Sequence, residues 1–105
     1  MSLKWPNKDP DELLDYSVDW SRFLGSDTIS AVTWYLYDEN DVKQELSDSE
    51  VINGLQFVTG TISGQVATAR FSLGTNNVRY TVVCRVNTSG GLQYERSIFL
   101  RVKEK

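Results

Sequence analysis

Hydrophobic and polar residues alternate along most of the chain, and the clearest alternation lies near its end. Residues 80–86 alternate strictly, with Tyr80, Val82, Cys84 and Val86 on one side, and a second run covers residues 94–102. A period of two is typical of a half-buried antiparallel strand. The turn-forming residues 87–91 separate the two runs, so the pattern predicts a hairpin.

The loop length of this hairpin follows from the side on which its residues lie. A two-residue turn at residues 90–91 would point Ile98 and Leu100 away from the core. A loop with an odd number of residues points both side chains toward the core. We expect a three-residue loop at residues 90–92, which pairs Cys84 with Ile98.

Shorter alternating runs fill the rest of the chain. They predict strands at residues 14–20, 28–37, 54–60 and 66–73. Residues 42–52 fit either a strand with a loop or a helical turn capped by Ser47. With turn signals every 8–12 residues, the chain reads as an all-β, immunoglobulin-like antiparallel sandwich of about seven strands.

The strand at residues 28–37 is apolar on both faces, so the sequence does not decide which face is buried. A bulge that changes which residues point to the core is favoured. The length of 105 residues indicates one domain. Both prolines fall early, so residues 1–12 are expected to form an extended N-terminal arm, and residues 13–105 the sandwich. The predicted core comprises Trp20, Ile29, Tyr80, Val82, Cys84, Val86, Ile98 and Leu100.

Chemistry-bearing residues are scarce. The chain has no His, and its single Cys84 lies on the inward face of a strand, so a disulfide, a cysteine zinc site and a His-activated nucleophile are excluded. The acidic turn at residues 38–41 invites a calcium site or an acid–base pair, but the Gly and distal Glu of a calcium loop are missing. We expect no enzyme activity, no metal site and no cofactor.

Charge and hydropathy reduce the classes of partner that the chain is expected to bind. A pI of about 4.8 argues against nucleic-acid binding. No run approaches the ~18 apolar residues of a membrane span, and the first residues lack the apolar stretch of a signal peptide. We therefore expect no membrane contact and a cytoplasmic location at synthesis.

The charge is unevenly distributed along the chain. Residues 26–60 hold one basic and seven acidic side chains, whereas residues 61–105 hold seven basic and two acidic ones. One interpretation is a mixed, solvated surface. The other is a pair of complementary poles that suits head-to-tail self-assembly into a homo-oligomeric ring.

Aromatic side chains are the candidate partner-binding groups. They are Trp5 on the N-terminal arm, together with Tyr35, Tyr37 and Tyr94. For each, packing within its own domain is the alternative. Trp34 belongs to the same group of strand aromatics and has the same alternative.

Two stretches resemble a known family. Residues 80–91 read Tyr-Thr-Val-Val-Cys-Arg-Val-Asn-Thr-Ser-Gly-Gly, which resembles the last strand pair of bacterial and phage immunoglobulin-like domains. Residues 8–16, with Trp20, Gly25 and Trp34 after them, are similar to small proteins encoded among phage and prophage structural genes, described as fibre-tail adaptor-like.

The resemblance implies a non-enzymatic virion or tail-associated adaptor. Such a protein would contact other phage structural proteins, in several copies, and would reside in the virion tail after assembly. The alternative function is an immunoglobulin-like module that binds carbohydrate or a host surface.

Overall fold

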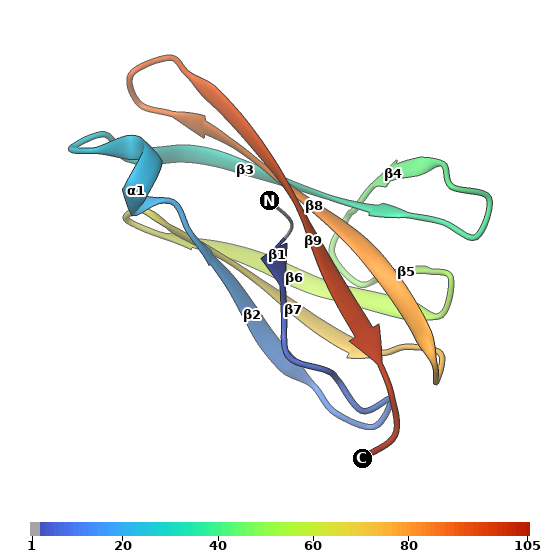
Figure 1. The fold of residues 1–105 in the computed structure, drawn as a ribbon. Helices are drawn as coiled ribbons and strands as arrows, with labels where there is room; N and C mark the ends of the chain where they lie inside the picture. The colour runs from blue at the N-terminus through green and yellow to red at the C-terminus, as the bar shows by residue number, and fades with distance from the viewer. Residues whose placement is uncertain (1–2) are drawn as a thin grey trace.

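The computed structural model describes residues 3–105, which fold into two stacked β-sheets (Figure 1). The elements in chain order are β1 (Leu3–Lys4), β2 (Leu14–Asp19), α1 (Ser21–Leu24), β3 (Ile29–Tyr37), β4 (Lys43–Glu45), β5 (Glu50–Ile52), β6 (Leu55–Ser63), β7 (Val66–Leu73), β8 (Val78–Thr88) and β9 (Gln93–Val102). One sheet has the order β1-β9-β8-β3-β4 and the other the order β2-β7-β6-β5. This arrangement confirms the predicted all-β sandwich.

The structure describes nine strands where about seven were expected. One addition is β1, which pairs with β9 in parallel. The other arises because residues 42–52 hold two short strands, β4 and β5, rather than one. The Ser47 N–H donates to Glu50 Oε1, as in one half of a helix capping box, while the Glu50 N–H donates to the Ser47 backbone carbonyl. These bonds close a turn that leads into the short strand β5.

The β8–β9 hairpin lies within the five-stranded sheet. Its loop has an odd number of residues, as the alternation of inward and outward residues predicted. The exact register was wrong by two residues, because Ile98 lies opposite Val82 and not opposite Cys84. The loop is tightened by Thr88, whose N–H donates to the Leu92 carbonyl at 2.8 Å and whose Oγ1 accepts from the Leu92 N–H at 3.0 Å. These bonds place the turn at residues 89–91.

The expected bulge in β3 is present. The pairing of β3 with β8 shifts register between Ile29 and Ala31. The shift lets Ile29 enter the core at the start of the strand, while Trp34 and Leu36 enter it further along. The pairing of β6 with β7 also shifts register, between Phe57 and Thr59. The strand β6 does not end at Gly60 as expected but continues to Ser63.

The core lies between the sheets. All eight residues predicted for it are buried, and Cys84 is fully enclosed. Burial raises the pKa of the Cys84 thiol to about 12, so the thiol stays protonated at neutral pH. The small residues Ala67 and Ala69 of β7 leave room for the large side chains of Trp34, Phe57 and Phe71.

Residues 1–2 of the expected N-terminal arm lie outside the described residues, and residues 3–12 pack onto the sandwich. Trp5 is 8% exposed and stacks on Tyr16 with ring centroids 4.9 Å apart. The Trp5 backbone N–H donates to Phe99 of β9, and its indole Nε1 donates to the Ser17 carbonyl of β2. The segment thus joins the edge strands of both sheets, and we call this the closed side of the sandwich.

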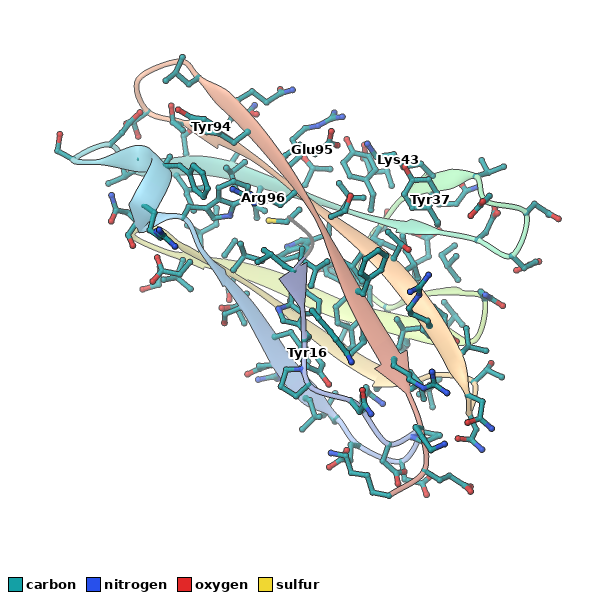
Figure 2. The ribbon with its side chains drawn as sticks, in the orientation of Figure 1. Tyr16, Tyr37, Lys43, Tyr94, Glu95 and Arg96 are labelled. Carbon is teal, nitrogen blue, oxygen red and sulfur yellow. The ribbon has the colours of Figure 1, made fainter. Side chains whose placement is uncertain are left out.

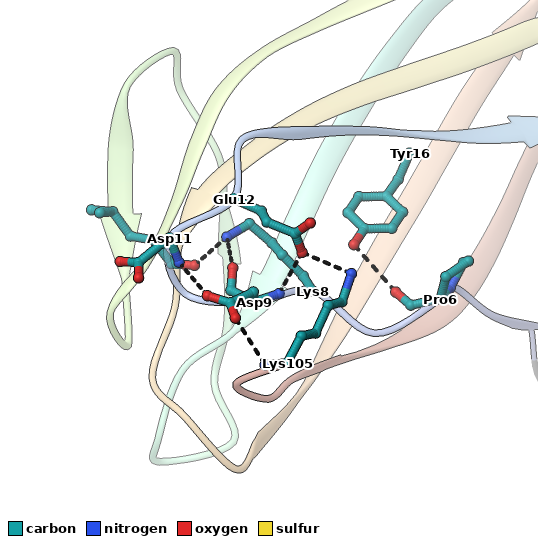
Figure 3. A network of polar contacts seen from close by, with 8 residues as sticks. Pro6, Lys8, Asp9, Asp11, Glu12, Tyr16 and Lys105 are labelled. Atoms are coloured by element: carbon teal, nitrogen blue, oxygen red, sulfur yellow. Dashed lines mark hydrogen bonds and ion pairs between the residues drawn. The ribbon is translucent and has the colours of Figure 1, made fainter.

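Lys8 completes the closed side. Its side chain is inaccessible to solvent, and Nζ donates to the carbonyls of Asp9 at 2.9 Å and Leu73 at 2.6 Å (Figure 3). Burial lowers the Lys8 pKa, while the nearby carboxylate of Glu12 opposes that shift. Lys105 bonds to both Asp9 and Glu12, so the end of the described chain is fixed beside residue 9.

Residues 9–12 form a turn of the kind that can begin a helix, closed by a bond from the Glu12 N–H to the Asp9 carbonyl. Its capping contacts do form, since the Asp9 N–H donates to Glu12 Oε1 and the Asp11 N–H donates to Asp9 Oδ1. The chain then enters β2 instead of a helix, because the alternating apolar and polar residues 14–19 favour a strand. The helix α1 has four residues, and no helix within residues 3–105 is long and apolar enough to cross a membrane.

Candidate interaction surface

The outer face of the five-stranded sheet carries a group of aromatic side chains from three strands. Alternation places Tyr35 and Tyr37 of β3, Val83 of β8 and Phe99 of β9 on this face. Val83 is only 2% exposed although it points away from the core, because the side chains around it cover it. We call Tyr35, Tyr37, Val83 and Phe99 the aromatic face.

A charged network crosses the aromatic face. Lys43 of β4 reaches Glu95 of β9 with Nζ and Oε1 2.6 Å apart, and Arg85 Nη2 lies 3.2 Å from the same oxygen. Arg85 Nη1 also donates to the Tyr35 hydroxyl at 2.8 Å. The hydrogen bond from Lys43 holds the pKa of Glu95 below its usual range, so the carboxylate stays charged at neutral pH.

The same cations lie over aromatic rings. Lys43 Nζ is 4.6 Å and the Arg85 guanidinium 4.9 Å from the centroid of the Tyr35 ring, and Arg79 lies 4.6 Å from that of Phe99. Cation–π contacts fix long side chains against the sheet. These contacts hold the long side chains of this face against the sheet.

A shallow depression of about 340 Å³ opens at one end of the aromatic face. It is lined by Tyr37, Asp41, Thr81, Ser97 and Phe99. Tyr37 and Lys43 lie toward the β3–β4 end, and Glu95 lies on β9 (Figure 2). Half-buried aromatic rings beside charged side chains are a combination found in protein–protein interfaces.

The sequence model of the family described as podophage GP4 fiber-tail adaptor protein gp77 matches residues 8–101. The chain belongs to this family. The membership confirms the resemblance to fibre-tail adaptor-like proteins that the sequence showed. A comparison with curated proteins gives no match.

In this adaptor-family chain, the four predicted partner-binding residues do not form one site. Tyr35 and Tyr37 share the aromatic face. Tyr94 lies at the hairpin end, with its ring centroid 6.2 Å from that of Trp20 and 6.3 Å from that of Phe23 (Figure 2). Trp5 is enclosed on the closed side, so its side chain packs within its own domain, which was the alternative expected for it.

The sequence did not predict Val83 and Phe99 of the aromatic face, or Lys43, Arg85 and Glu95 of the charged network. Phe99 had a usable signal, because it is the apolar residue on the outward side between Ile98 and Leu100. The three charged residues had no such signal in the sequence. Lys43 and Glu95 are 52 residues apart and come together through the strand order β9-β8-β3-β4.

Proposed function

We propose that this chain is a non-enzymatic adaptor of a phage or prophage tail, and that its aromatic face binds another virion protein. The observation that carries the proposal is the family match together with a preorganised aromatic and charged surface on one sheet. The partner would bury Tyr37 and Phe99 and leave the charged network at the rim. The role needs no cofactor and no catalytic residue.

The test uses a phage genome that carries the variant gene. We expect Tyr37→Glu to reduce the amount of tail fibre on purified particles, measured by gel densitometry and electron microscopy, because a buried charge without a partner opposes binding. Ser21→Glu is the control with the same added charge, since Ser21 is exposed on α1, outside the aromatic face. Equal fibre content in both variants would contradict the aromatic face as the binding surface.

One observation favours a second candidate function. Tyr35, Tyr37 and Phe99 lie on one sheet face, and aromatic side chains on a flat surface suit a sugar ring. A glycan array separates the two functions. Specific glycan binding that Tyr37→Ala abolishes would favour a carbohydrate- or host-surface-binding module over the adaptor.

The distribution of charge supports assembly of several copies. Six of the acidic side chains lie within residues 38–50, near β4 and β5, whereas Lys4, Arg79 and Arg101 lie on β1, β8 and β9. Head-to-tail contact between these regions would bring opposite charges together. Mass measurement in solution at low and high salt tests this, and a monomer under all conditions would contradict a ring formed by this chain alone.

A further inference from the structure

The side of the sandwich opposite the N-terminal segment is bordered by two very short strands. The strand β4 pairs with β3 only at Tyr35–Tyr37, and β5 pairs with β6 only at Leu55–Phe57. Among residues 3–105, no strand pairs with residues 30–33 of β3 or with residues 59–63 of β6 on this side. We call the region between these two stretches the open side.

The backbone of β3 presents hydrogen-bonding groups to the open side. The Trp34 carbonyl accepts from the Leu46 N–H at 2.9 Å on this side. Antiparallel strands direct the N–H and C=O of every second residue the same way, so those of Val32 also point outward here. Residues 30–33 contain neither proline nor lysine, the residues that usually shield an exposed strand edge.

A groove of about 240 Å³ runs along this free stretch. Val32, Thr33 and Trp34 line one wall, and Gly60 belongs to the other. The Trp34 indole is 2% exposed and ends against Gly60, and its Nε1 has no hydrogen-bond partner within the described residues. The fold thus leaves both backbone and side-chain donors unsatisfied along this side.

The rim of the groove is acidic. Glu45 and Asp48 line it and are both exposed, while none of its lining residues within the described part of the chain is basic. A second copy using the same edge would bring two acidic rims together, which disfavours self-pairing. The charge therefore selects a cationic occupant.

We propose that the open side binds an extended, lysine- or arginine-bearing segment of a partner protein, which pairs with residues 30–33 of β3 as an added strand. The stretch of four residues spans about 13 Å of strand and continues the line of β4. Main-chain bonds to Val32 supply affinity, and contacts of the basic side chains with Glu45 and Asp48 supply charge specificity. This surface is distinct from the aromatic face.

The test is an NMR titration of the isotope-labelled protein with a short synthetic peptide in which lysine alternates with valine and threonine. At about 1 mM peptide, we expect shifts of the amide resonances of residues 30–34 and 59–63. A glutamate counterpart should leave them unmoved. A lysine peptide with N-methylated backbone should bind about tenfold more weakly, since it cannot donate to β3.

Two variants sharpen the test. Val32→Pro removes the N–H that the added strand needs and should abolish the shifts. Reversing the rim with Glu45→Lys and Asp48→Lys changes exposed side chains only, and should transfer binding from the lysine to the glutamate peptide. Absence of binding, shifts confined to the aromatic face, self-association instead of peptide binding, or an unchanged preference in the reversed variant would each overturn the proposal.

Discussion

The two long sides of the sandwich differ in how the edges of their sheets are covered. On both sides, the edges of two sheets lie next to each other and need cover. The closed side is covered by residues 3–12, which pair with β9 and place Trp5 and Lys8 between the sheets. Among residues 3–105, the open side has two three-residue strands, β4 and β5, and retains a groove in which Trp34 Nε1 has no partner.

The difference predicts which side contributes more to the stability of the fold and which side leaves exposed groups that a partner could contact. The closed side combines buried aromatic area with backbone and side-chain hydrogen bonds, and each of these stabilises the folded state. The open side is left with acidic, exposed residues at its rim and free backbone groups. Substitutions on the two sides should therefore differ in their effect on the free energy of unfolding.

The largest effect is expected for Trp5→Ala. It removes a buried indole that stacks on Tyr16 and bonds to Ser17, so the free energy of unfolding should fall by about 3–5 kcal/mol. Urea titration monitored by circular dichroism measures it. Leu13→Ala, at a residue that is 57% exposed, is the control and should change stability by less than ~0.5 kcal/mol. A loss for Trp5→Ala no larger than that of the control would show that the segment does not seal the sandwich.

Gly60→Ala should have the next largest effect and probes the floor of the open side. An added Cβ would lie 2.7 Å from Trp34 Nε1 and 2.9 Å from its Cδ1, so the indole must move. Overpacking of this kind costs about 1–3 kcal/mol. Ser63→Ala, on an exposed residue of the same strand, is the matched control for thermal unfolding. Equal melting temperatures would mean that the groove accommodates the methyl group.

Tyr16→Phe tests the closed side through pH. Burial raises the pKa of Tyr16 from 10.0 to about 12, and its hydroxyl donates to the Pro6 carbonyl at 3.2 Å. The unfolded chain releases this proton near pH 10.0 and the folded chain only near 12, so this contribution to stability is complete below pH 10 and is lost as pH rises toward 12.

The variant lacks that pH-dependent contribution. At pH 7, losing the hydrogen bond should cost about 0.5–1.5 kcal/mol. Between pH 9 and 11, its free energy of unfolding should fall less steeply than that of the wild type in urea titrations. Parallel curves for the two proteins would mean that Tyr16 ionises equally in the folded and unfolded chains.

The smallest effect is expected for Asp48→Asn on the open side. Asp48 is exposed at the groove rim, so the free energy of unfolding should change by less than ~0.5 kcal/mol. The same urea titration checks it. A loss comparable to that of Gly60→Ala would indicate that the rim stabilises the fold, and it would remove the contrast between the two sides.

Strand alternation was enough to predict the sandwich and its core, because inward residues such as Val82 and Ile98 repeat every second position. The parity of the β8–β9 loop followed from the same rule, but the register did not. Registers two residues apart keep every side chain on the same face, so alternation cannot distinguish them. The bonds between Thr88 and Leu92 fit the observed register.

The N-terminal segment and the aromatic face were harder to predict. Two prolines made residues 1–12 look like a free arm, and nothing local indicated that Lys8 would reach the Leu73 carbonyl, 65 residues away. The glycine at position 60 suggested a strand end, whereas the strand needs it there because Trp34 fills the space of a side chain. Contacts between residues far apart in the chain follow from the sheet order, which alternation alone leaves open.

The parallel pairing of the N-terminal segment with β9 has a mechanical consequence. Bonds from Trp5 to Phe99, from Lys8 to Arg101 and from Lys103 to Lys8 lie one after another along the two strands. A force that pulls Leu3 and Lys105 apart acts along these strands, so it shears the bonds together instead of unzipping them singly. The sandwich should resist tension applied through its ends far better than tension applied across β4 and β5.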